Sequence, residues 1–107
     1  MTDSPSVAFD LLTTQLLDDP DLDVSVTVTG LHVRGRLFAY LDDDALVVDL
    51  PRSRAADLVE RGVAAPVVAG RAEPKGSWVS IADAEDWPEL ASEAHQFVGE
   101  PAVGMDS

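Results

Sequence analysis

The sequence predicts an α+β fold, a single two-layer domain in which an antiparallel sheet of about four to five strands has helices packed on one face. Three observations lead to this fold class. The chain has 107 residues, which suits one hydrophobic core and is too short for two. Segments of helical and strand periodicity follow one another in the order α-β-β-β-α-β-(β)-α, and hairpin-length turns join the strands, which favours antiparallel pairing. One domain is expected over residues 1–107, with a core in residues 7–98 and a flexible tail over 99–107.

The first element is expected to be a short amphipathic helix. Its segment, SPSVAFDLLTTQLLDD, opens with a Ser/Pro start signal, and its apolar residues recur at helical spacing. The stripe that should face the core holds Ala8, Leu11, Leu12 and Leu16. Pro20 lies among aspartates and disfavours a helical residue before it, so a loop is expected after the helix.

Three antiparallel strands are expected after this loop. The first alternates between apolar and hydroxyl side chains, the pattern of a half-buried strand, with its apolar positions at Val24, Val26 and Val28. Gly30 is expected to turn or bulge the chain into a second strand over residues 31–41. A polar turn of aspartates then leads to the third strand, ALVVDL, whose leucines join the core.

The second half of the chain is expected to hold two helices and two shorter strands. Pro51 suits the first turn of a helix over RSRAADLVERG, and Gly62 is a good cap for its end. The stretch VAAPVVAGRAEPKGS favours a short edge strand followed by a loop, and WVSI favours a further strand. A last helix, WPELASEAHQFV, is expected to be capped by Asp86 and to face inward through Leu90, Ala91, Ala94 and Phe97.

The few basic residues are clustered, because five of the seven lie between residues 34 and 61 of a chain whose formal net charge is −13. The expected second strand presents part of this cluster on a face where cations and aromatic rings are mixed. The residues of this expected binding face are His32, Arg34, Arg36, Phe38 and Tyr40, joined by Arg52, Arg54 and Lys75. Such a face could hold phosphates and stack bases, as single-strand binders do. Alternatively, its arginines pair with Asp49 and its rings pack against neighbours or a second subunit.

A family resemblance rests on residues 35–62 and on five positions that follow them. The stretch is GRLFAYLDDDALVVDLPRSRAADLVERG, and the later positions are Gly70, Arg71, Pro74, Lys75 and Trp78. This pattern resembles the MmcQ/YjbR-like proteins and the related TfoX N-terminal-like domains over residues 24–98. The resemblance implies no enzyme activity and a DNA-binding role, with Arg36, Arg54, Lys75 and Trp78 at positions that match the family pattern. In the stretch AEPKGS and the residue after it, the spacing of Pro74, Lys75 and Trp78 differs from the family pattern.

The composition argues against several classes of protein. The chain has no cysteine, which excludes disulfides, thiolate metal sites and cysteine nucleophiles. No apolar run approaches the roughly 18 residues of a membrane span, and the first residues lack the features of a secretory signal. A cytoplasmic protein without a membrane partner is therefore expected. A net charge of −13 also repels nucleic acid over most of the surface.

Motifs for catalysis, metal binding and nucleotide binding do not rise above background. The segment DDPDLD has the ligand spacing at which a calcium loop begins, but Val24 and Gly30 stand where that loop needs glycine and glutamate. The aspartates at 42–44 favour a solvated turn. His32 and His95 have no nucleophile motif beside them. We therefore expect no catalytic residues, no metal and no cofactor.

The sequence thus favours a small non-enzymatic binding protein of the MmcQ/YjbR-like type. The first expectation is protein interaction, with an unknown partner or with a second copy in a homodimer. The alternative is DNA binding through the basic and aromatic strand face, which the resemblance implies and the net charge disfavours.

Overall fold

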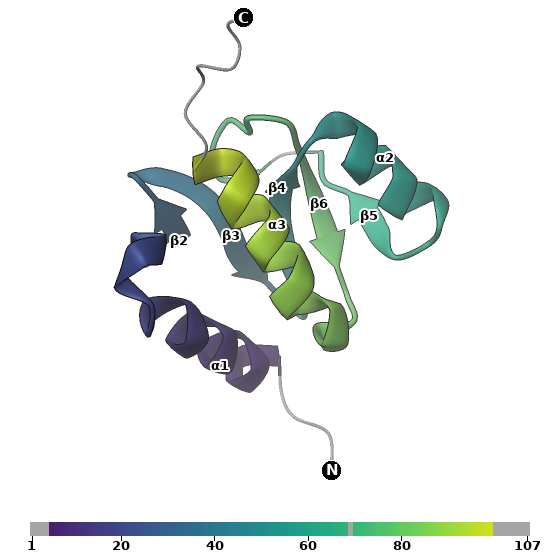
Figure 1. Ribbon diagram of the computed structural model, residues 1–107. Helices are drawn as coiled ribbons and strands as arrows, with labels where there is room; N and C mark the ends of the chain where they lie inside the picture. The colour runs from purple at the N-terminus through teal and green to yellow at the C-terminus, as the bar shows by residue number, and fades with distance from the viewer. Residues whose placement is uncertain (1–4, 69, 100–107) are drawn as a thin grey trace, which may run out of the picture.

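The computed structural model describes residues 5–68 and 70–99, and it confirms the predicted α+β class. In this part of the chain a six-stranded antiparallel sheet, with strand order β1-β2-β3-β4-β6-β5, is accompanied by three α-helices (Figure 1). The expected tail lies outside the described residues apart from Gly99, which ends the last helix. Within the described residues no helix is long and apolar enough to cross a membrane.

The elements follow one another nearly as expected. The helices are α1 (Pro5–Leu17), α2 (Arg52–Glu60) and α3 (Trp87–Gly99), with 3₁₀ turns at Pro20–Leu22 and Ala84–Asp86. The strands are β1 (Val24–Thr27), β2 (Gly30–Val33), β3 (Arg36–Asp42), β4 (Ala45–Leu50), β5 (Ala64–Pro66) and β6 (Ser77–Ile81).

The expected second strand is divided into β2 and β3 by a turn that the sequence analysis missed. Arg34 and Gly35 both have positive φ, at 55° and 81°, the geometry of the two-residue turns whose twist suits antiparallel strands. Val33 and Arg36 therefore face each other across the hairpin. Glycine adopts this conformation readily, which favours a turn at Gly35. Because the turn makes two strands out of the expected second strand, the sheet has six strands, one more than the upper end of the expected range.

The three helices cover the same face of the sheet (Figure 1). One buried cluster joins them to the strands, and its helical members are Leu12, Leu16, Ala55, Leu58, Trp87, Leu90, Ala91, Ala94 and Val98. The Trp87 indole reinforces this core because its N–H donates to the Ile81 carbonyl at 2.8 Å. The predicted inward stripe of α3 is largely confirmed, since Leu90, Ala91 and Ala94 are buried and Phe97 is partly buried against them.

Three expected core positions are exposed instead, all of them in α1 or the first hairpin. Leu11 is 56% exposed, because α1 buries only the stripe of Leu12 and Leu16. Val26 is 46% exposed and Val28 is fully exposed, because β1 is the edge strand of the sheet and Val28 lies in the turn after it. An edge strand lacks the second neighbour that completes the burial of a central strand.

The opposite face of the sheet is covered by the segment that joins β5 to β6. A second buried cluster lies there, formed by Leu37, Tyr40, Val47 and Trp78. Arg71 of the segment lies over the Tyr40 ring, 4.4 Å from its centroid, and donates to the carbonyls of Thr29 and Leu41 at 2.7 and 3.2 Å. The sheet therefore buries side chains on both faces.

Candidate functional site

The expected binding face is not one surface, because a β-bulge divides it. Leu31 pairs with Ala39 while the next residue, His32, pairs with Leu37, so Phe38 is an extra residue in β3. Phe38 consequently lies in the core beneath the helices, and Tyr40 lies in the cluster on the other face. The prediction that these two rings share an exposed face is wrong, since they are 0% and 2% exposed.

Both rings are engaged by other aromatic side chains. Phe38 meets His95 of α3 edge to face at 5.5 Å, and His95 Nε2 forms a hydrogen bond with the Leu22 carbonyl. Tyr40 meets Trp78 of β6 edge to face at 5.4 Å. Burial raises the pKa of the Tyr40 hydroxyl. Neither ring is therefore available to stack on a base.

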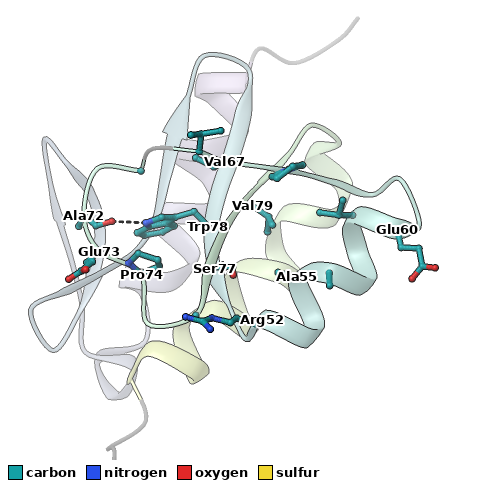
Figure 2. Close-up of a pocket in the computed structure, with 16 residues that line it drawn as sticks. Arg52, Ala55, Glu60, Val67, Ala72, Glu73, Pro74, Ser77, Trp78 and Val79 are labelled. Carbon is teal, nitrogen blue, oxygen red and sulfur yellow. Dashed lines mark hydrogen bonds between the residues drawn. The ribbon is translucent and has the colours of Figure 1, made fainter.

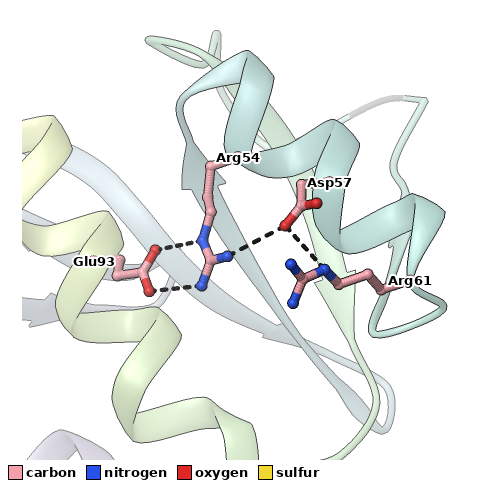
Figure 3. A network of polar contacts seen from close by, with 4 residues as sticks. All are labelled: Arg54, Asp57, Arg61 and Glu93. Carbon is pink, nitrogen blue, oxygen red and sulfur yellow. Dashed lines mark hydrogen bonds and ion pairs between the residues drawn. The ribbon is translucent and has the colours of Figure 1, made fainter.

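Arg54 is partly exposed and ties α2 to α3. Its guanidinium donates to both carboxylate oxygens of Glu93, at 2.9 and 3.0 Å (Figure 3). The Asp57 carboxylate forms ion pairs with Arg54 at 3.6 Å and with Arg61 at 3.2 Å. The network holds the two helices side by side and uses a cation that the sequence analysis assigned to binding.

A double-mutant cycle is expected to give a coupling of about 0.5–1 kcal/mol between Arg54 and Glu93, because both side chains are partly exposed. The variants are Arg54→Ala, Glu93→Ala and the pair, measured by urea denaturation. Arg54→Lys is the control that keeps the charge and loses the two-pronged contact. Additive effects of the two single variants would contradict this role.

The remaining cations are distributed over three places. Arg34 and Arg36 are exposed at the β2–β3 hairpin. The Lys75 ammonium donates to the Phe97 carbonyl at 2.7 Å and lies 4.9 Å from the centre of the Phe97 ring. Arg52 is exposed at the first turn of α2. Of the expected face, the structure brings His32, Arg36 and Lys75 together around one small cavity of about 250 Å³.

Asp49 lines the same cavity, and among residues 5–68 and 70–99 it is the one charged residue that is buried, with 1% of its surface exposed. Its two carboxylate oxygens accept the backbone N–H groups of Lys75 and Gly76, at 2.6 and 2.9 Å. Both oxygens of Asp49 are thus bonded to backbone N–H groups, whereas the sequence alternative expected an arginine as its partner. A Cβ at Gly76 would lie 2.2 Å from the Leu50 carbonyl oxygen, so glycine is needed where the chain enters β6. Asp49 thus fixes the end of the covering segment.

Asp49 should also make folding stability depend on pH. Burial raises the pKa of this carboxyl, and the two backbone N–H groups oppose that effect. A carboxyl whose folded-state pKa is raised binds protons more readily when folded, so its contribution to stability is full below the unfolded pKa and is lost as pH rises through the folded pKa. We expect the stability difference between wild type and Asp49→Asn to fall over that window, measured by urea denaturation at a series of pH values. A difference that grows with pH would contradict it.

A large hollow that the sequence analysis missed lies along the outer edge of β6 (Figure 2). It has a volume of about 810 Å³. One wall is α2, through Ala55, Ala56 and Val59, and the other is the segment after β5, through Val67, Val68 and Pro74. Trp78 and Val79 of β6 lie between the two walls. We call this space the α2 hollow.

The α2 hollow exists because β5 accompanies β6 for only part of its length. The strands pair from Ala64 opposite Ile81 to Pro66 opposite Val79, and the Val67 N–H donates to the Trp78 carbonyl at 3.4 Å before the chain leaves the sheet edge. The Trp78 indole N–H then donates to the Ala72 carbonyl at 2.7 Å, which ties the segment around the ring. A Cβ at Gly70 would lie 2.4 Å from the same indole, so glycine permits this close approach. In the sequence, the Pro and Gly residues of this segment indicated a loop and gave no further sign of the hollow.

No family model, curated protein or solved structure matches this chain. Residues 5–68 and 70–99 also contain no group of three or more His, Asp or Glu side chains placed to hold a metal ion. The α2 hollow and the Asp49 cavity are therefore interpreted from their own chemistry.

Proposed function

We propose that this chain is a small, non-enzymatic, cytoplasmic binding protein, and that the α2 hollow receives apolar side chains of a protein partner. The observation that carries the proposal is an open hollow of about 810 Å³ with alanine, valine and tryptophan side chains in its walls. Concave apolar sites of this size are where ligands and the anchoring side chains of partners are buried.

The hollow is supported by a framework that holds its walls in place. Leu58 of α2 is buried in the main core, so this wall is fixed to the sheet. The opposite wall is held by the hydrogen bond from Trp78 to Ala72 and by the two bonds to Asp49. A preformed site loses less conformational entropy on binding than one that must first be ordered.

The charges around the hollow indicate what kind of segment it suits. Arg52 and Glu60 lie at the two ends of α2, and Glu73 lies on the opposite rim. With a net charge of −13 over the whole chain, the surroundings favour a partner with basic residues. The proposed ligand is therefore a peptide segment with apolar anchors and flanking lysine or arginine.

The family resemblance and the alternative of DNA binding stay proposals. Among the described residues of the expected binding face, the exposed cations that DNA could contact are Arg34 and Arg36 at one hairpin and Arg52 at the start of α2, whereas Arg54 is paired with Glu93. With Phe38 and Tyr40 buried, this surface offers no ring for base stacking. We therefore place protein binding ahead of DNA binding.

Selection of random peptides on the purified protein, by phage display, tests the proposal. We expect the selected sequences to combine apolar and basic residues, and their affinity to fall at least about tenfold in Ala56→Arg, which places a long cation in the hollow. Ser53→Arg is the matched control, because it makes the same charge change on α2 and Ser53 does not line the hollow. Equal affinity for both variants would overturn the proposed site.

A further inference from the structure

We propose that a second copy of this chain binds the outer edge of β1, so that two sheets join into one continuous antiparallel sheet across a two-fold axis. This surface lies at the opposite end of the sheet from the α2 hollow, since β1 and β5 are the terminal strands. The proposal concerns homodimerisation and does not depend on the function proposed for the hollow.

The first argument is the set of backbone groups along this edge. Thr27 and Gly30 face each other across a two-residue turn, and Ser25 faces His32 two positions along. Such closing pairs exchange their hydrogen bonds within the hairpin, so the residues between them point their N–H and C=O groups outward. Val24 and Val26 therefore present backbone donors and acceptors on the side of β1 that pairs with no strand of the described residues.

The second argument is charge. The run from Val24 to Val33 has ten residues without a formal charge, in a chain with 20 acidic and 7 basic residues. Edge strands are usually protected by charged residues, proline or short length. The opposite edge has that protection, because β5 spans three residues and ends with Pro66. β1 reads VSVT and has neither a charge nor a proline.

These arguments select a second copy as the occupant. A basic partner, which the net charge would otherwise favour, finds no carboxylate on β1. A second β1 strand, by contrast, is uncharged and self-complementary in an antiparallel arrangement. With Val26 opposite Val26, the two residues exchange both backbone hydrogen bonds, and Ser25 lies opposite Thr27 on the other face. The exposed Val26 side chains, now 46% accessible, would then cover each other.

Sedimentation equilibrium over a range of concentrations tests the proposal. Wild type is expected to approach twice the 11.4 kDa chain mass as concentration rises, and Val26→Lys is expected to stay at the chain mass. Ser53→Lys is the matched control, because it adds the same charge at an exposed residue of α2 that does not line the hollow, and it should dimerise like wild type. A wild type that is monomeric up to about 1 mM, or a Val26→Lys variant that dimerises equally, would overturn the proposal.

Hydrogen exchange on the wild type provides a second measurement, free of any effect of substitution on folding. The Val26 amide should exchange slowly at high concentration and faster on dilution, because pairing with Val26 of the second copy protects it. The Ser25 and Thr27 amides, bonded within the hairpin, serve as the internal control and should change less. A Val26 amide that exchanges at the same rate at all protein concentrations would contradict the interface.

Discussion

Replacement of Phe38 by alanine is expected to lower the free energy of unfolding by about 3–5 kcal/mol. The ring is fully buried in the main core and contacts His95 of α3 edge to face at 5.5 Å. Its loss leaves a cavity between the sheet and α3, which cannot close without moving one of them. Urea denaturation followed by far-UV circular dichroism measures the change.

Two controls separate core packing from the surface role expected from the sequence. Phe38→Leu keeps most of the apolar volume and should have a clearly smaller effect than the alanine variant. Arg36→Ala changes an exposed neighbour on the same strand and should alter stability by less than about 0.5 kcal/mol. Unchanged stability in Phe38→Ala would place the ring on the surface and contradict the bulge in β3.

The second large effect is expected for Asp49→Ala, which should lower the free energy of unfolding by about 2–4 kcal/mol. The substitution removes both acceptors of the Lys75 and Gly76 N–H groups, at 2.6 and 2.9 Å, and leaves these donors facing a methyl group. Such donors lose their solvation without gaining a partner. Urea denaturation measures the stability, and exchange of the Gly76 amide measures the local effect.

Asp49→Asn is the matched control because its amide keeps one acceptor oxygen and turns an N–H₂ group toward the other donor. It should therefore lie between wild type and Asp49→Ala in stability. If the Gly76 amide of Asp49→Ala exchanged at the wild-type rate, and the variant unfolded at the same urea concentration as wild type, Asp49 would not hold the segment that joins β5 to β6.

The parts of the fold that were predicted depend on local signals. Pro51 before α2, Gly62 after it and the spacing of apolar residues in α3 are readable from a few neighbouring residues, and the structure confirms those helices. The hairpin between β2 and β3 was missed because its first turn residue is Arg34, a side chain that seldom adopts positive φ. Gly35 was the available signal for that turn.

The predicted site failed for reasons that lie beyond local sequence. Strict alternation places Phe38 and Tyr40 on one face, but the bulge against β2 depends on which residues pair across strands. Arg54 meets Glu93 only because α2 and α3 pack side by side. The α2 hollow likewise joins a helix to a segment that returns to the sheet many residues later, around Trp78. Contacts between distant segments decide these features.

The central claim, that the α2 hollow binds a partner segment, is tested most directly by the two indole N–H signals in a ¹H–¹⁵N NMR spectrum. Trp78 and Trp87 are the two tryptophans of the chain; Trp78 lines the hollow, whereas Trp87 is buried in the main core. On titration with a selected peptide, we predict that the Trp78 signal shifts together with the backbone amides of Ala56 and Val59, while the Trp87 signal stays in place. Binding that shifts the amides of Arg34 and Arg36 and leaves Trp78 unmoved would contradict the claim.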